Sequence, residues 1–145
     1  MINAIFFYRI EHWLYKKKIP FLPKVVKFLI FLLYNSSIPY QCSIGKGTKF
    51  SYGGISVVVH KRTVIGNNCI IGSCVTLGGR SGIFEVPIVG DNVYLGTGSK
   101  LIGNITIGNN VTIGANAVVL NDIPDNAVVV GIPAKIIKYN SKKNN

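Results

Sequence analysis

The chain has 145 residues, of which 48% are hydrophobic and 14% charged, and its formal net charge is +11. This length accommodates one domain with a short appendage, and the high apolar fraction excludes an intrinsically disordered chain. The basic charge is concentrated in residues 1–40 and 135–145, whereas the nearly neutral middle shows neither a recognition helix nor a stacked aromatic sheet, so nucleic-acid binding is not expected.

Two helices are predicted at the start of the chain, from Asn3 to about Lys17 and from Pro23 to about Tyr34. Pro20 and Pro23 disfavour one continuous helix. The apolar run VVKFLIFLLY has ten residues, and about 20 are needed to cross a bilayer. It also lies far from Met1 and lacks the small-residue cleavage site of a signal peptide. We therefore expect residues 1–38 to form a helical segment that does not cross a membrane.

Two interpretations of residues 1–34 stay open. In the first, the helices pack on the rest of the domain or mediate contact between subunits. In the second, they form a membrane-surface anchor that holds a cytoplasmic protein on the inner face of the membrane, because aromatic side chains beside lysines suit an anionic leaflet. The residues concerned are the aromatics Phe6, Phe7, Trp13, Phe28 and Phe31 and the lysines Lys16, Lys17, Lys18, Lys24 and Lys27.

From Val59 onward an aliphatic residue recurs at every sixth position. The eleven positions are Val59, Ile65, Ile71, Leu77, Ile83, Val89, Leu95, Leu101, Ile107, Ile113 and Val119. A fixed period of six is typical of hexapeptide repeats in a parallel β-helix, in which each hexad is a short strand and a turn, and three hexads close one coil. The pattern predicts an all-β fold with four to five coils over residues 44–125. The alternative is a β-sandwich or β-barrel of short strands.

The period is disturbed in two places. Phe50 and Val59 are nine residues apart, so the chain must bulge or change phase between them. The segment GGRSGIFEVP, residues 78–87, has the composition of a loop. We interpret it as an excursion from the coil, in which Ile83 is in register by accident.

The three cysteines are odd in number and show no CxxC spacing. Without an export signal, Cys42, Cys69 and Cys74 are interpreted as reduced thiols of a cytoplasmic protein in the core or in turns. They need no chemical role.

Several motifs resemble those of a known family. The segments GGISVVVHKRTVIGNN, CIIGSCVTLGGRSG and GIPAKII, within residues 40–138, are similar to the serine acetyltransferase branch of the hexapeptide acyltransferases. The similarity is strongest to its short members, which act in capsule, exopolysaccharide and O-antigen acetylation. The resemblance implies a left-handed β-helix acyltransferase domain over residues 39–138, trimers with active sites between subunits, acetyl-CoA as donor and no metal. Residues 139–145 would be a polar tail.

The acetyl transfer that this resemblance implies requires a base for the acceptor hydroxyl, and histidine is the usual choice. His60 is the only histidine of the repeat body, since His12 lies in the first predicted helix. Relatives often carry a histidine base where this chain has Tyr52. Three alternatives follow: His60 is the base, Tyr52 positions the acceptor while another group deprotonates it, or the protein is catalytically impaired.

The resemblance also bears on the acceptor. In serine acetyltransferases, acidic residues precede the catalytic histidine and an Arg-His pair follows the VTLGG loop. The corresponding stretches here are SSIPYQC, FSY and FEVPI, which lack those acids and that pair. Losing such partners weakens binding of an amino acid. We therefore expect a saccharide hydroxyl as acceptor, in surface polysaccharide biosynthesis, with Arg80 and Glu85 as hydrogen-bonding residues.

The donor is expected along the groove between coils, where small residues let the pantetheine arm approach and lysines meet the phosphates. The candidate residues are Gly78, Gly79, Gly96, Gly98, Gly114, Ala115 and Lys135. The glycines could instead simply make tight turns. Two alternative functions are a serine O-acetyltransferase of cysteine biosynthesis and a non-catalytic scaffold subunit. A γ-class carbonic anhydrase is excluded, because its zinc requires three histidines.

Overall fold

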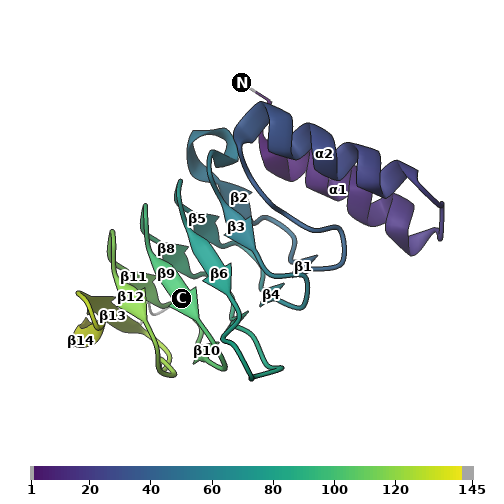
Figure 1. Ribbon diagram of the computed structural model, residues 1–145. Coiled ribbons are helices and arrows are strands. Elements are labelled where there is room, and N and C mark those ends of the chain that lie inside the picture. The colour runs from purple at the N-terminus through teal and green to yellow at the C-terminus, as the bar shows by residue number, and fades with distance from the viewer. Residues whose placement is uncertain (1, 142–145) are drawn as a thin grey trace.

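The chain forms a left-handed parallel β-helix of about four turns with two helices at its N-terminal end, as the sequence and its resemblance predict (Figure 1). The computed structural model describes residues 2–141, and the last residues of the predicted polar tail, 142–145, lie outside that range. Coils stack along one axis from the helices to the C-terminal hairpin (Figure 1).

The two helices begin and end within one residue of the predicted positions. Helix α1 covers Ala4–Lys16, and the side chain of Asn3 caps it by accepting a hydrogen bond from the Ile5 amide at 3.1 Å. Helix α2 covers Leu22–Tyr34, with Pro23 in its first turn, where a missing N–H costs nothing. The two helices lie side by side (Figure 1). Between residues 2 and 141 no helix is both long enough and apolar enough to cross a membrane.

The strands of successive coils stack in register into three sheets. The first sheet contains β1 (Ser43–Ile44), β4 (Val64–Ile65), β7 (Ile88–Val89) and β10 (Thr106–Ile107). The second contains β2 (Lys49–Phe50), β5 (Ile70–Ile71), β8 (Tyr94–Leu95), β11 (Thr112–Ile113), β13 (Ala127–Val130) and β14 (Lys135–Tyr139). The third contains β3 (Val58–Val59), β6 (Thr76–Gly78), β9 (Lys100–Ile102) and β12 (Val118–Val119). The pairing is parallel throughout except between β13 and β14, which form an antiparallel hairpin.

The aliphatic residues that recur at every sixth position form the core of the solenoid. Every aliphatic position of that series is buried except Ile83, which is 38% exposed because it lies in the loop between β6 and β7. Each fully buried aliphatic side chain contributes about 1.5–3 kcal/mol relative to exposure. The phase change after Phe50 is a short 3₁₀ segment, Ser51–Gly54, which widens one corner of the first coil. Both predicted irregularities are therefore confirmed.

A ladder of side-chain oxygens ties the corners of neighbouring coils together. The Oδ1 atoms of Asn67, Asp91 and Asn109 accept hydrogen bonds from the preceding coil's amides at 2.8 Å, and Asp125 does the same at 2.7 Å. These groups satisfy corner amides that no strand can pair. Asp91 and Asp125 are accordingly structural carboxylates.

Candidate active site

His60 lies in a cavity between the first coils and helix α2. It directly follows β3 and is half-buried. The cavity has a volume of about 330 Å³, at the small end of the range for small-molecule sites. Its lining residues are Lys27, Pro39, Gln41, Val58, Val59, His60, Lys61, Leu77 and Gly78. The lining therefore comes from the coil, from residues 39 and 41 that precede β1, and from Lys27 of α2.

The surroundings of His60 keep its ring neutral. Burial lowers the pKa of His60, and the positive charges of Arg62 and Lys61 lower it further. The Nδ1 atom accepts a hydrogen bond from the Arg62 amide at 3.2 Å, so the neutral ring carries its proton on Nε2. To accept a proton at Nε2, the ring must take the other tautomer and give up this long bond. That costs about 1 kcal/mol, less than the roughly 3–5 kcal/mol that a positioned base contributes.

Arg62 connects His60 to the loop between β6 and β7. Its guanidinium donates through Nε to the carbonyl oxygen of Phe84 at 3.1 Å and lies 3.9 Å from the centre of the Phe84 ring. This combination of a hydrogen bond and a cation–π contact holds the loop beside His60. Glu85 lines a neighbouring cavity of about 230 Å³ together with Arg62 and Phe84.

The other predicted acceptor-site and catalytic residues do not line the cavity of His60. Tyr52 lies on the 3₁₀ segment with a φ of 51° and is 73% exposed. Arg80 is exposed and packs beside Gly103 on the next coil. Within one chain the structure thus brings His60 together with Gly78, and leaves Tyr52, Arg80 and Glu85 outside this cavity.

The glycines predicted to contact the donor have structural reasons of their own. A Cβ on Gly96 would lie 2.6 Å from the amide nitrogen of Ala115, and one on Gly114 would lie 2.8 Å from Val130. Gly98 has a φ of 75°, which favours glycine. Close stacking of coils explains these three, whereas Gly79 and Ala115 are exposed, and Lys135 is exposed on β14. The alternative that these glycines make tight corners is consistent with this geometry.

Four of the donor candidates lie at the opposite edge of the third sheet from His60. Gly96, Gly98, Gly114 and Ala115 precede strands of that sheet, whereas His60 follows β3, Gly78 is the last residue of β6 and Gly79 follows β6. A residue before a strand and a residue after it lie at different corners of the triangular coil. Within one chain these four donor candidates therefore do not lie at the corner of His60, whereas Gly78 and Gly79 do.

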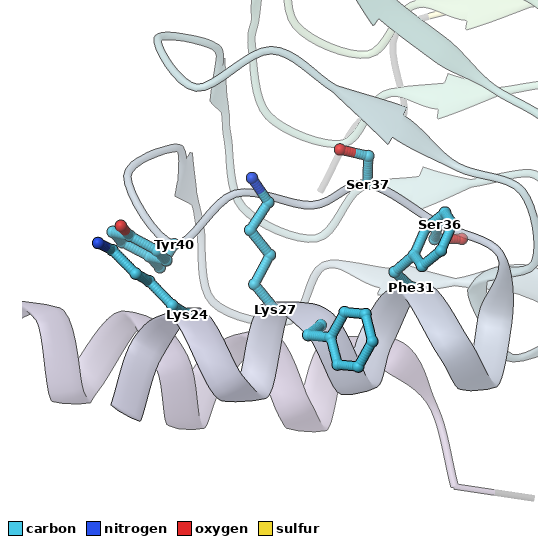
Figure 2. A pocket seen from close by; sticks show the side chains of 7 residues that line it. Lys24, Lys27, Phe31, Ser36, Ser37 and Tyr40 are labelled. Atoms are coloured by element: carbon cyan, nitrogen blue, oxygen red, sulfur yellow. The ribbon is translucent and has the colours of Figure 1, made fainter. Parts of the chain in front are cut away.

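Sequence reasoning missed the contribution of helix α2. Lys27, Pro39 and Gln41 line the cavity of His60, and Lys27 also lines a second cavity of about 450 Å³ between α2 and residues 36–40 (Figure 2). Figure 2 shows Lys27 reaching from α2 toward the first coil. In the sequence, Lys27 was one lysine among five, and no motif distinguished it. Among residues 2–141 no group of three His, Cys, Asp or Glu side chains is arranged to hold a metal ion.

Comparisons with known proteins identify relatives of this chain among the serine acetyltransferases. Residues 87–121 match the family model described as bacterial transferase hexapeptide (six repeats). The chain is 39% identical over 138 residues to a serine acetyltransferase of Synechococcus elongatus, covering 93% of this chain and 56% of that relative. It is 37% identical to the serine acetyltransferase of Helicobacter pylori strain J99, covering 94% of this chain and 80% of the relative.

Solved structures agree with these relatives. The crystal structure of serine acetyltransferase in complex with coenzyme A from Brucella abortus strain S19 superposes with a TM-score of 0.90 at 31% identity, over 95% of this chain and 56% of that one. The chain thus spans little more than half the length of several of the proteins it matches.

These relatives overturn the predicted saccharide acceptor and its place in polysaccharide biosynthesis. The matched proteins are named for serine, at 39% and 37% identity over most of the chain. The prediction rested on charged partners that are absent from three stretches of sequence. Those stretches do not include helix α2, whose Lys27 lines the cavity of His60.

Proposed function

Because this chain belongs to the serine acetyltransferase family of hexapeptide-repeat transferases, we propose that it transfers the acetyl group of acetyl-CoA to the hydroxyl of serine. The observation that carries the proposal is the 37% identity with a relative of which the chain covers 80%. The site supports it: a neutral histidine lines a cavity of amino-acid size, with lysines in the same lining.

The chemistry follows from the position of His60. The serine hydroxyl oxygen attacks the thioester carbonyl carbon while Nε2 of His60 takes the hydroxyl proton. When the tetrahedral intermediate collapses, the C–S bond breaks, and the imidazolium returns the proton to the departing thiolate. The products are O-acetylserine and CoA. Ala115 and Lys135 remain as candidates for contact with the donor, since both are accessible.

We further propose that the active unit is a homotrimer with its sites between subunits. The separation of donor corner and His60 corner supports this assembly, as do exposed apolar side chains on the coil faces, including Val58, Val64, Ile88 and Tyr94. Sedimentation well above micromolar concentration is expected to give three times the monomer mass of 15.8 kDa. A species of monomer mass under those conditions would contradict the proposal.

We also propose that the helix pair contacts an anionic membrane surface. Helices α1 and α2 expose Phe6, Trp13, Phe28 and Leu32 by more than half, and the lysines at 16–18 are exposed as well. At about 1 kcal/mol per lysine, replacing Lys16, Lys17 and Lys18 with glutamine is expected to weaken binding to phosphatidylserine vesicles about 100-fold at low salt. Cosedimentation measures this. Equal vesicle binding by the triple variant and the wild type would contradict the proposed membrane contact. So would a wild type that does not bind vesicles, as expected where another segment or subunit covers the helix pair.

The acceptor is tested by comparing substrates. Release of the CoA thiol is measured with serine, threonine or a monosaccharide as acceptor at fixed acetyl-CoA. We expect kcat/KM to be highest for serine. A preference for the monosaccharide, or release that is independent of any acceptor, would overturn the proposed function.

A further inference from the structure

Lys27 is the residue at which helix α2 meets the candidate active site. It is half-buried and lines both the 330 Å³ cavity of His60 and the adjoining 450 Å³ cavity. Lys24, one turn earlier on the same helix, lines only the second of these (Figure 2). Lys61 also lines the cavity of His60, but it is exposed, and exposed charges are screened by solvent. Lys27 is therefore the more buried of the two lysines that line this cavity.

The charge of Lys27 is not neutralised by the nearest acid. Glu11 of α1 is fully buried, and neither of its carboxyl oxygens has a hydrogen-bond partner within the described residues. Burial raises the pKa of Glu11 to about 8, although the charge of Lys27 opposes the rise. Because neither oxygen of Glu11 bonds to the Lys27 ammonium, that ammonium has no carboxylate partner on α1 and is available to an anion in the cavity that Lys27 lines.

An amino-acid acceptor presents a carboxylate two bonds from the carbon that carries its hydroxyl group. If His60 takes the hydroxyl proton, the carboxylate must lie in the same small cavity. We propose that Lys27 binds the acceptor's carboxylate there and so selects an amino acid over a neutral alcohol, an assignment that rests on the proposed function. The sequence predicts acceptor contacts at Arg80 and Glu85, but neither residue lines this cavity.

The test compares serine with serinamide, which lacks the carboxylate charge, as acceptors for the full-length protein. Replacing Lys27 with methionine is expected to raise the KM for serine about 10- to 100-fold, the range for losing a charged hydrogen bond. The KM for serinamide, kcat and the KM for acetyl-CoA should change little. The wild-type preference for serine over serinamide should therefore disappear in Lys27→Met.

Three further variants make the result specific. Lys24→Met removes the same charge one turn away and should keep the wild-type KM for serine, and Lys27→Arg should keep most of the preference for serine. A Lys27→Met enzyme whose KM values match those of Lys24→Met would overturn the assignment while leaving the proposed function intact. A raised KM for serine in Lys61→Met but not in Lys27→Met would also overturn it. If the wild type does not acetylate serine at all, both proposals fail.

Discussion

Replacing His60 with alanine is expected to lower kcat by about 10²–10⁴, the range for removing a positioned general base. Acetyl-CoA binding should barely change, because Gly96, Gly98, Gly114 and Ala115 lie at the opposite edge of the third sheet. Initial rates and calorimetric titration with acetyl-CoA measure the two effects separately. A scaffold protein would show no heat on acetyl-CoA addition.

A glutamine at position 60 distinguishes two roles of the ring. In the structure Nε2 carries the proton of the neutral ring, so His60 could also act as a hydrogen-bond donor. Glutamine can donate a hydrogen bond but cannot act as a base. A base role predicts that His60→Gln is as impaired as His60→Ala, whereas high activity of His60→Gln would identify a donor. Tyr52 lies outside the cavity of His60 within one chain, so it can contact serine only across the proposed subunit interface. With that contact, Tyr52→Phe raises the KM for serine about fivefold, for one lost hydrogen bond of about 1 kcal/mol. Abolished turnover in Tyr52→Phe together with an active His60→Ala would reverse the two roles.

The pH profile follows from the lowered pKa of His60. A base must be neutral to accept a proton, so activity is lost as pH falls through this pKa. Because burial and the charges of Arg62 and Lys61 lower it, the acid limb of kcat/KM should lie below pH 6.5, the ordinary histidine value. The residual activity of His60→Ala should not show this fall of kcat/KM at acidic pH. An acid limb above pH 6.5 would contradict this environment for His60.

Replacing Gly96 with alanine is expected to destabilise the fold by at least about 3 kcal/mol, the upper part of the range for overpacking. The added Cβ would lie 2.6 Å from the Ala115 amide nitrogen and 2.7 Å from the Gly114 carbonyl carbon. Both are backbone atoms of the next coil, which cannot move aside without breaking the stack.

Gly79 provides the matched control. A Cβ there would make only ordinary contacts, the nearest at 3.6 Å from His60 and Val86. Gly79→Ala should therefore keep the wild-type stability within about 0.5 kcal/mol, as is usual for surface substitutions. Urea unfolding followed by circular dichroism compares the two variants. Equal unfolding midpoints would show that the coils are not stacked as closely as described.

The solenoid was predictable from the sequence because the same six-residue pattern is repeated along its core. Each hexad places an aliphatic residue inward, and the outcome at each position depends on neighbours six and eighteen residues away. Even the exception was predictable, since Ile83 stands in a segment with loop composition and is exposed. The helix bounds followed from Asn3 as a cap and from the prolines.

The site was less predictable because it depends on contacts between distant segments. Lys27 reaches His60's cavity only through the packing of α2 beside the first coil, which no period in the sequence encodes. The glycines were ambiguous because a structural requirement alone explains them. Close stacking of the coils requires glycine at position 96 whether or not acetyl-CoA binds there. The Arg62 amide that fixes the His60 tautomer is likewise visible only in three dimensions.

The most direct measurement of the central claim is the mass of the product formed from serine and acetyl-CoA that carries a ¹³C-labelled acetyl group. The wild-type protein is expected to form labelled O-acetylserine in a one-to-one ratio with released CoA, and His60→Ala should form almost none in the same time. CoA release without labelled O-acetylserine, or equal product from both proteins, would contradict the account.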